Sequence, residues 1–128
     1  MKTKILGQSK LDSIFGAAGY AACSKVSSLS FFEDSQSTET SYSIILALET
    51  DRLDDNYRLR MRFTGVQDLK IREFGARPTQ ITGFDVIDIG DRQLEGMNFE
   101  VTDYENGVIH FFCKTASVDD IERIDAAS

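Results

Sequence analysis

The stretch Tyr57–Phe63, with the sequence YRLRMRF, contains the clearest structural pattern in the chain. Apolar residues alternate strictly with arginines, which is the period of a β-strand that has one covered and one open face. The pattern predicts that four side chains face a core and that the three arginines face outward. The inward residues are Tyr57, Leu59, Met61 and Phe63.

The same period of two recurs along most of the chain after residue 26. It is present in SYSIILALET (41–50), around Leu69 and Ile71, in Phe84–Ile89 and in the two runs at 97–101 and 107–113. For the last segment, 118–124, the pattern leaves an edge strand or a short helix open. We expect about seven strands, a number typical of an antiparallel β-sandwich or a strongly curved sheet.

Residues 9–22 follow a different period and predict one short helix. The apolar residues at helical spacing are Leu11, Ile14, Phe15 and Ala18. Ser9 stands where it could cap the start, and Gly16 and Gly19 weaken the second half. We therefore expect a helix that frays into a loop.

Composition and charge restrict the class of protein. The 128 residues are 41% hydrophobic and 27% charged, which indicates a soluble single domain over 1–128 with a β region from about 26 to 124. The net charge of -7 argues against nucleic-acid or anionic-membrane binding. No signal-peptide core and no apolar run of roughly 20 residues is present. We expect a cytoplasmic protein whose two cysteines, Cys23 and Cys113, are reduced and buried.

The dipeptide Asn106-Gly107 predicts a hairpin near the C-terminus. It is typical of a two-residue type I′ turn, in which both central residues accept positive φ. Counting outward from such a turn sets Asp103 opposite His110 and Val101 opposite Phe112. Because the second strand of this hairpin is apolar on both faces, we expect it to be central and covered on both sides. The N-terminal helix is the natural cover for one of them.

Candidate catalytic groups are few. The lone histidine excludes a zinc site built on several imidazoles. The predicted register places His110 beside Asp103, which is half of a Ser-His-Asp triad but also a common cross-strand contact. No G-x-S-x-G elbow accompanies the pair. Cys113 lies three residues from His110 on one strand, so the two side chains point to opposite faces.

Carboxylates and glycines give no stronger signal for a site. Asp85, Asp88 and Asp91 are spaced by three, but this spacing departs from a D-x-D-x-D-G calcium loop, and the apolar residues between them belong to a strand. We expect a solvated strand end there. Neither a G-x-G-x-x-G nor a P-loop pattern occurs. The sequence therefore predicts no catalytic residues, no metal and no cofactor.

Five cations occupy outward positions of two successive predicted strands. They are Arg58, Arg60, Arg62, Lys70 and Arg72. If those strands pair, the like charges repel one another, so something must balance them. An acidic neighbouring strand, with Glu100 or Asp85 as candidates, is favoured because acidic residues outnumber basic ones 21 to 14. The alternative is an external acidic or anionic partner, for which the five residues form the binding surface. Nucleic acid is not expected there, because the aromatic residues of this strand face inward.

The order of several segments resembles a known pattern. The segments are SIFG (13–16), SLS (28–30), IILALE (44–49), LRMRFTGVQDLKI (59–71), ITGFDVIDI (81–89) and MNFEVTDYENGVIHFFC (97–113). The motif R-F-x-G-V-x-x-L-x-I and the closing hairpin contribute most to the match. Over about 13–124 the chain resembles small β-rich immunity-type proteins that accompany polymorphic toxins in bacteria.

The resemblance implies a non-enzymatic protein that binds and blocks a cognate toxin, and it implies no catalytic residues. The acidic balance suits such a role, because a negative inhibitor associates rapidly with a basic toxin. Two other hypotheses stay open. One is a structural protein that forms a homo-oligomer through an exposed sheet edge. The other, less favoured, is a small hydrolase that uses His110 with Asp103 or Glu100.

Overall fold

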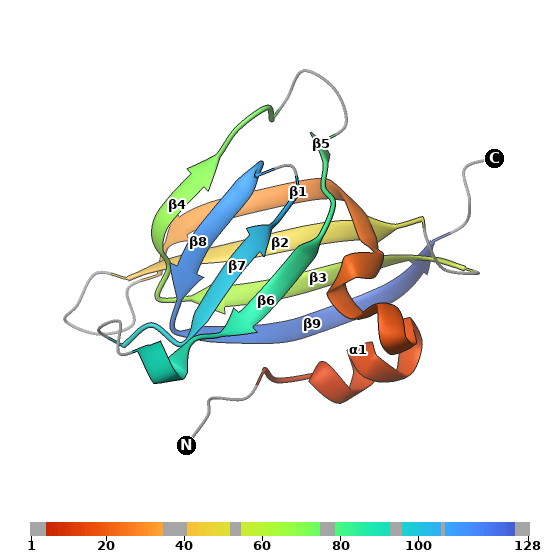
Figure 1. Cartoon of the computed structure of the whole chain (residues 1–128), viewed down its shortest axis with the longest axis horizontal. Helices are drawn as coiled ribbons and strands as arrows, with labels where there is room; N and C mark the ends of the chain where they lie inside the picture. The colour runs from red at the N-terminus through yellow and green to blue at the C-terminus, as the bar shows by residue number, and fades with distance from the viewer. Residues whose placement is uncertain are drawn as a thin grey trace.

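The computed structural model describes residues 5–34, 41–51, 55–74, 79–92, 96–105 and 107–124. Within these ranges the chain forms two antiparallel sheets that pack against each other, with one helical segment near the N-terminus (Figure 1). The predicted mainly β sandwich with a short N-terminal helix is confirmed. The described residues contain nine strands rather than about seven, and one of the nine has only two residues.

The five-stranded sheet has the order β5-β1-β2-β3-β9. Its strands are β1 (Cys23–Glu33), β2 (Tyr42–Thr50), β3 (Asn56–Thr64), β5 (Thr79–Gln80) and β9 (Thr115–Ile124). The stretch YRLRMRF forms most of β3, which lies between β2 and β9. The segment at 118–124, for which strand and helix were both open, belongs to strand β9.

The four-stranded sheet has the order β4-β8-β7-β6. Its strands are β4 (Gln67–Ile71), β6 (Phe84–Asp88), β7 (Phe99–Asp103) and β8 (Ile109–Cys113), and a 3₁₀ turn at Gly90–Arg92 follows β6. Leu69 packs against the core as predicted, whereas Ile71 is 45% exposed. The reason is that β4 is an edge strand, so the inner side of Ile71 is only partly covered.

The core lies between the two sheets, and β3 supplies its centre. Leu59, Met61 and Phe63 are fully buried, and Tyr57 is half-buried against the core, as the alternation predicts. The ring of Phe63 meets Phe111 of β8 edge to face, with ring centroids 5.1 Å apart. Such aromatic pairs add to the burial of apolar surface, so this contact joins an interior strand of one sheet to an interior strand of the other.

The helical segment consists of α1 (Gln8–Phe15) and the 3₁₀ segment η1 (Gly16–Ala22). Gly16 and Gly19 both adopt positive φ, which ends the α-helix where the sequence predicts weakening. The predicted cap at Ser9 is wrong, because the N-cap is Gly7, at φ 82°. A Cβ atom at Gly7 would lie 2.7 Å from the carbonyl oxygen of Val118, so a side chain cannot fit this approach to β9.

The helical segment lies at one end of the sandwich, against β9 and β6 (Figure 1). The expectation that it covers a face of β8 is therefore wrong. Its buried side chains, Leu11 and Phe15, belong to the same core that the two sheets enclose, and Ala18 is exposed. The outer face of β8 carries half-buried side chains instead.

The register of the β7–β8 hairpin differs from the predicted one by a single residue. His110 faces Thr102, and Phe111 faces Val101. Asn106 lies outside the described residues, but its neighbours show why a two-residue turn does not form. The backbone oxygen of Asp103 accepts a bond from Gly107, and its side-chain Oδ1 accepts one from Ile109.

The residues after Asp103 bond to another segment of the chain. The backbone N–H groups of Tyr104 and Glu105 donate to the carbonyl oxygens of Gly83 and Thr82, just before β6. A one-residue shift moves every side chain of a strand to the opposite face. Phe111 and Cys113 are consequently buried in the core, and His110 lies on the outer face.

Candidate partner-binding surfaces

The structure divides the five predicted surface cations between two sheets. Arg58, Arg60 and Arg62 lie on the outer face of β3, in the five-stranded sheet. Lys70 lies in β4 and Arg72 directly after it, in the four-stranded sheet. Because β3 pairs with β2 and β9 while β4 pairs with β8, the cations do not form one continuous stripe.

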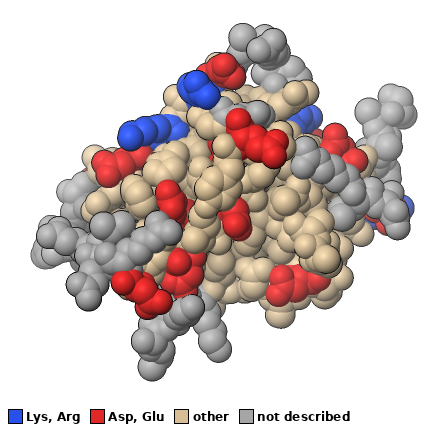
Figure 2. Space-filling view, in the orientation of Figure 1, with Lys and Arg blue, Asp and Glu red and all other residues tan. Residues whose placement is uncertain are grey.

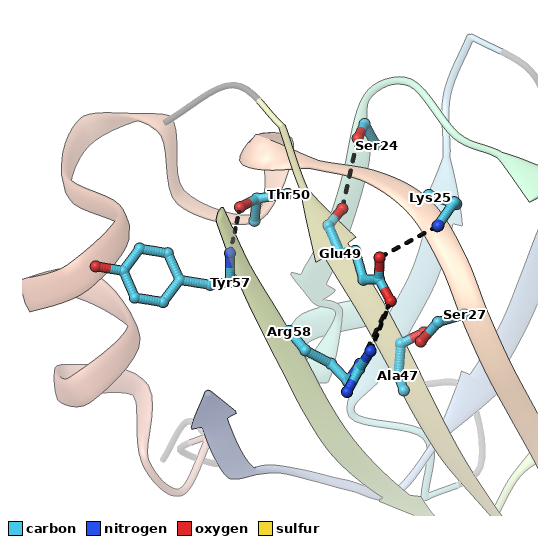
Figure 3. A network of polar contacts seen from close by, with 8 residues as sticks. All are labelled: Ser24, Lys25, Ser27, Ala47, Glu49, Thr50, Tyr57 and Arg58. Atoms are coloured by element: carbon cyan, nitrogen blue, oxygen red, sulfur yellow. Dashed lines mark hydrogen bonds and ion pairs between the residues drawn. The ribbon is translucent and has the colours of Figure 1, made fainter. Parts of the chain in front are cut away.

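Glu49 of β2 is the centre of a polar network beside Arg58 (Figure 3). Arg58 donates through Nη2 and Nε to Glu49 Oε2, at 3.1 and 3.3 Å, and Lys25 Nζ lies 3.2 Å from Glu49 Oε1. Partial burial by itself raises the pKa of the Glu49 carboxyl. The hydrogen bonds from Arg58 and Lys25 outweigh that effect and hold its pKa below the ordinary value. Glu49 therefore stays ionised and neutralises two cations.

The other two arginines of β3 differ in their surroundings. Arg62 Nε lies 3.5 Å from Asp119 Oδ2 of β9. Arg60 is exposed, sits between Ala47 and Asp120 in the sheet register, and forms no ion pair with a described residue. Within this sheet, Glu49 and Asp119 thus neutralise the positive charges of Arg58 and Arg62. The candidates Glu100 and Asp85 are wrong for this role, because they lie in the other sheet.

The two cations near β4 have separate environments. Arg72 donates through Nε to the backbone oxygen of Gly107, at 2.9 Å, and so binds the loop that precedes β8. Lys70 is exposed and faces His110 across the β4–β8 ladder. Neither residue approaches the arginines of β3 through strand pairing. The sequence pattern grouped these residues only because their strands are consecutive.

Of the two carboxylates that the hydrolase hypothesis names, His110 contacts Glu100 and not Asp103. Its Nε2 lies 2.8 Å from Glu100 Oε2, and its ring meets Phe112 edge to face at 5.1 Å. Asp103 is fully buried on the inner face, so it cannot orient the imidazole. Cys113 is likewise buried and points away from His110, as the strand geometry predicts. The proposed His110–Asp103 pair is therefore wrong.

The outer face of the four-stranded sheet is dominated by acidic side chains. Figure 2 shows Asp and Glu spread across this face, with a few Lys and Arg at its upper edge. Strands β6 and β7 contribute Asp85 and Glu100 to this face, and the exposed Glu105 lies in the turn after β7. The half-buried Ile87 and Phe112 lie on either side of Glu100, on the two neighbouring strands. Sequence reasoning missed this face, although a correct hairpin register would have placed Glu100 opposite Phe112.

Two of the three aspartates with regular spacing accept hydrogen bonds from nearby backbone N–H groups. Asp85 Oδ1 accepts from the backbone of Val86, and Asp88 Oδ1 accepts from that of Gly90. Among the residues that the structure describes, no group of three His, Cys, Asp or Glu could hold a metal ion. Cys23 and Cys113 are buried and not joined in a disulfide, and burial raises the pKa of Cys113 to about 12.

Two open depressions flank the N-terminal segment, with volumes of about 540 and 360 Å³. The larger lies between residues 5–9 and the inner-facing side of β6 and β7, and Asp88 is its one acidic lining residue. The smaller lies between η1 and the start of β6, where Asp85 and Tyr104 line it. His110 belongs to neither, so the imidazole does not face a substrate-sized hollow in either place.

Comparison with known proteins identifies the class to which this β-sandwich belongs, which is that of immunity proteins. The chain is a member of the family described as Immunity protein PIM8, whose model matches residues 20–119. That range runs from the end of η1 into β9 and includes both charged outer faces. No curated protein and no solved structure matches the chain. None of the described helices is long and apolar enough to cross a membrane.

Proposed function

We propose that this chain neutralises a cognate bacterial toxin by binding to it directly in the cytoplasm, without catalysing a reaction. The observation that carries this proposal is membership of the immunity family over residues 20–119. The geometry supports a binding role in two ways. The outer sheet faces are broad and charged, and the one imidazole bonds to Glu100 beside Phe112 rather than to a nucleophile.

We further propose that the toxin docks on the acidic outer face of the four-stranded sheet. Asp85 on this face and the exposed Glu105 in the turn after β7 form no ion pair with a described residue, so their charge is available to a basic partner. The half-buried Ile87 and Phe112 would supply apolar contact between the acids. Complementary charge of this kind accelerates association and selects the partner.

The arginines of β3 are the alternative docking surface. Arg58 and Arg62 are already neutralised by Glu49 and Asp119, which leaves Arg60 as the available charge. A partner that used this face would be acidic. With a net charge of -7, the chain as a whole favours the approach of a basic partner instead.

Titration of the toxin with the purified chain tests the role itself. The toxin would be the one encoded beside this chain's gene. A stoichiometric blocker abolishes toxin activity only near one chain per toxin. An enzyme would inactivate an excess of toxin at a small fraction of that ratio, and this outcome would exclude the proposed role. A gene neighbourhood without any toxin would also count against it.

Single charge reversals test the docking face. Asp85→Lys should slow association with the toxin about tenfold at low salt, because it reverses one charge of the proposed face. Glu122→Lys is the matched control, since Glu122 is exposed in β9 of the other sheet and forms no ion pair with a described residue. If Arg60→Glu weakens toxin binding at unchanged stability while Asp85→Lys does not, the docking face is that of β3.

A further inference from the structure

Strand β1 has an open edge along more than half its length. It pairs with β2 from Cys23 to Glu33, but on its other side it pairs with β5 only at Lys25 and Val26. No other described strand pairs with β1 beyond that point. Figure 1 shows β1 at the margin of the five-stranded sheet, with β5 at one end of it. Within the described residues, the side of 28–33 that faces away from β2 is therefore unpaired, and such an edge is a template for a further strand.

Most of this open edge is uncharged and carries exposed aromatic surface. The run from Val26 to Phe32 contains no charged residue, in a chain in which 27% of residues are charged. Phe31 is 46% exposed and stacks on Tyr42, itself 40% exposed, with ring centroids 5.2 Å apart and planes at 8°. Proteins usually protect such an edge with lysine, proline or a covering segment. Here the run from Val26 to Phe32 lacks lysine and proline, and the ring of Phe31 is partly exposed to solvent.

We propose that the open edge of β1 pairs with β1 of a second copy of this chain, so that the two five-stranded sheets join into one. Charge selects this occupant. Two copies that each carry -7 repel wherever charged surfaces meet, and the run from Val26 to Phe32 is a surface on which they meet without that repulsion. A basic toxin, in contrast, gains nothing from an uncharged edge and has the acidic face available.

Two-fold symmetry determines the details of the pairing. In an antiparallel pair of identical strands, one residue must face its own copy. If Ser30 faces Ser30 of the second copy, Phe31 of each copy lies opposite Leu29 of the other. Glu33 of each copy then lies opposite Ser27 of the other. This register covers the exposed aromatic ring with an apolar partner and leaves no like charges face to face.

Light scattering or analytical ultracentrifugation of the full chain tests the pairing. The wild-type chain should have the mass of a dimer, and Phe31→Lys should halve that mass, because it places two lysines in the new ladder. Ile71→Lys is the matched control, since Ile71 is 45% exposed on the edge strand β4. It should leave the dimer intact. A wild-type chain that is monomeric at the highest attainable concentration would overturn the proposal.

A cysteine scan tests the register even if Phe31→Lys fails to fold. Directly opposed residues in an antiparallel pair lie within disulfide reach, and both native cysteines are buried. Ser30→Cys should therefore form a covalent dimer on mild oxidation. Ser28→Cys should not, because Ser28 would face Phe32 of the second copy. Equal cross-linking of both variants would contradict the two-fold pairing centred on Ser30.

Toxin titration separates this proposal from the proposed function. Phe31→Lys should still neutralise the toxin, since the acidic face is unchanged. If Phe31→Lys abolishes toxin binding and the wild-type chain is monomeric, the edge receives a strand of the toxin, and self-pairing is wrong. If the chain dimerises through β1 but never binds the toxin, only the proposed function fails.

Discussion

Glu49 and Arg58 face each other across β2 and β3, and Arg58 Nη2 lies 3.1 Å from Glu49 Oε2. The same carboxylate also forms an ion pair with Lys25 of β1, so Glu49 connects three neighbouring strands (Figure 3). Its side chain is only 17% exposed. The arginines on the outer side of YRLRMRF are thus tolerated because acids on adjacent strands of the same sheet neutralise two of the three.

Replacing Glu49 with glutamine should destabilise the fold, because Arg58 and Lys25 lose their counter-charge. We expect a loss of about 1 kcal/mol in the free energy of unfolding, at the upper end for ion pairs near a surface. Urea denaturation measures it. Glu122→Gln serves as the control, since Glu122 faces Arg58 from β9 but is exposed and forms no ion pair with a described residue. Equal effects of the two substitutions would mean that the network contributes nothing specific.

The lowered pKa of Glu49 predicts a dependence of stability on acid pH. The folded chain holds this proton more weakly than the unfolded chain, whose carboxyl titrates near 4.5. As the pH falls below that value, the unfolded chain takes up the proton first, so the stabilisation present above it is progressively lost. Chemical denaturation at several pH values should show a smaller acid-side loss for Glu49→Gln than for wild type. Parallel curves would argue against this assignment.

The inter-sheet contact between Phe63 and Phe111 predicts a large effect of truncation. Phe111→Ala should cost about 4 kcal/mol, because it opens a cavity in a fully buried site. Phe112→Ala, one residue further on, should cost about 1 kcal/mol, because Phe112 is half-buried on the outer face. Denaturant midpoints distinguish the two. The hairpin register predicted from Asn106-Gly107 puts Phe112 rather than Phe111 beside Val101, so a larger loss for Phe112→Ala would favour that register.

The buried thiols should be inert in the folded chain. Cys113 has a pKa raised to about 12 by burial, and Cys23 is fully buried as well. Because the thiolate is the reactive species, a disulfide reagent at pH 8 should label neither thiol until denaturant is added. Both cysteines should then react. Ser30→Cys, which adds an exposed thiol on β1, should be labelled at once after it has been reduced and the reductant removed, which shows that the reagent is active.

Local alternation was sufficient to predict much of the fold. The inward set of YRLRMRF is buried or half-buried, and the helical spacing that includes Leu11 and Phe15 gives a helix in the right place. These features depend on a single element and its one covered face, which the period of hydrophobic residues encodes directly. The end of that helix was likewise predictable, because Gly16 and Gly19 adopt conformations that other residues avoid.

The hairpin register was not predictable from Asn106-Gly107. The turn preference of this dipeptide competes with the side chain of Asp103, which bonds to Ile109, and with the bonds from Tyr104 and Glu105 to the segment before β6. Those bonds join residues about 20 positions apart in the chain. A local motif carries no information about such partners. The register differs from the predicted one by one residue, so Phe111 and not Phe112 faces Val101 in the core.

The amino-acid sequence by itself determined which side chains of each strand avoid water, and therefore that the chain folds as a mainly β protein with a short helix at its start. Only the tertiary structure decided which strands are neighbours. It paired Arg58 with Glu49 and His110 with Glu100, and it placed Lys70 in a different sheet from the arginines of β3. Strand order depends on packing between segments that are far apart in the chain. Burial follows a pattern within one segment, whereas charge balance depends on pairs of segments.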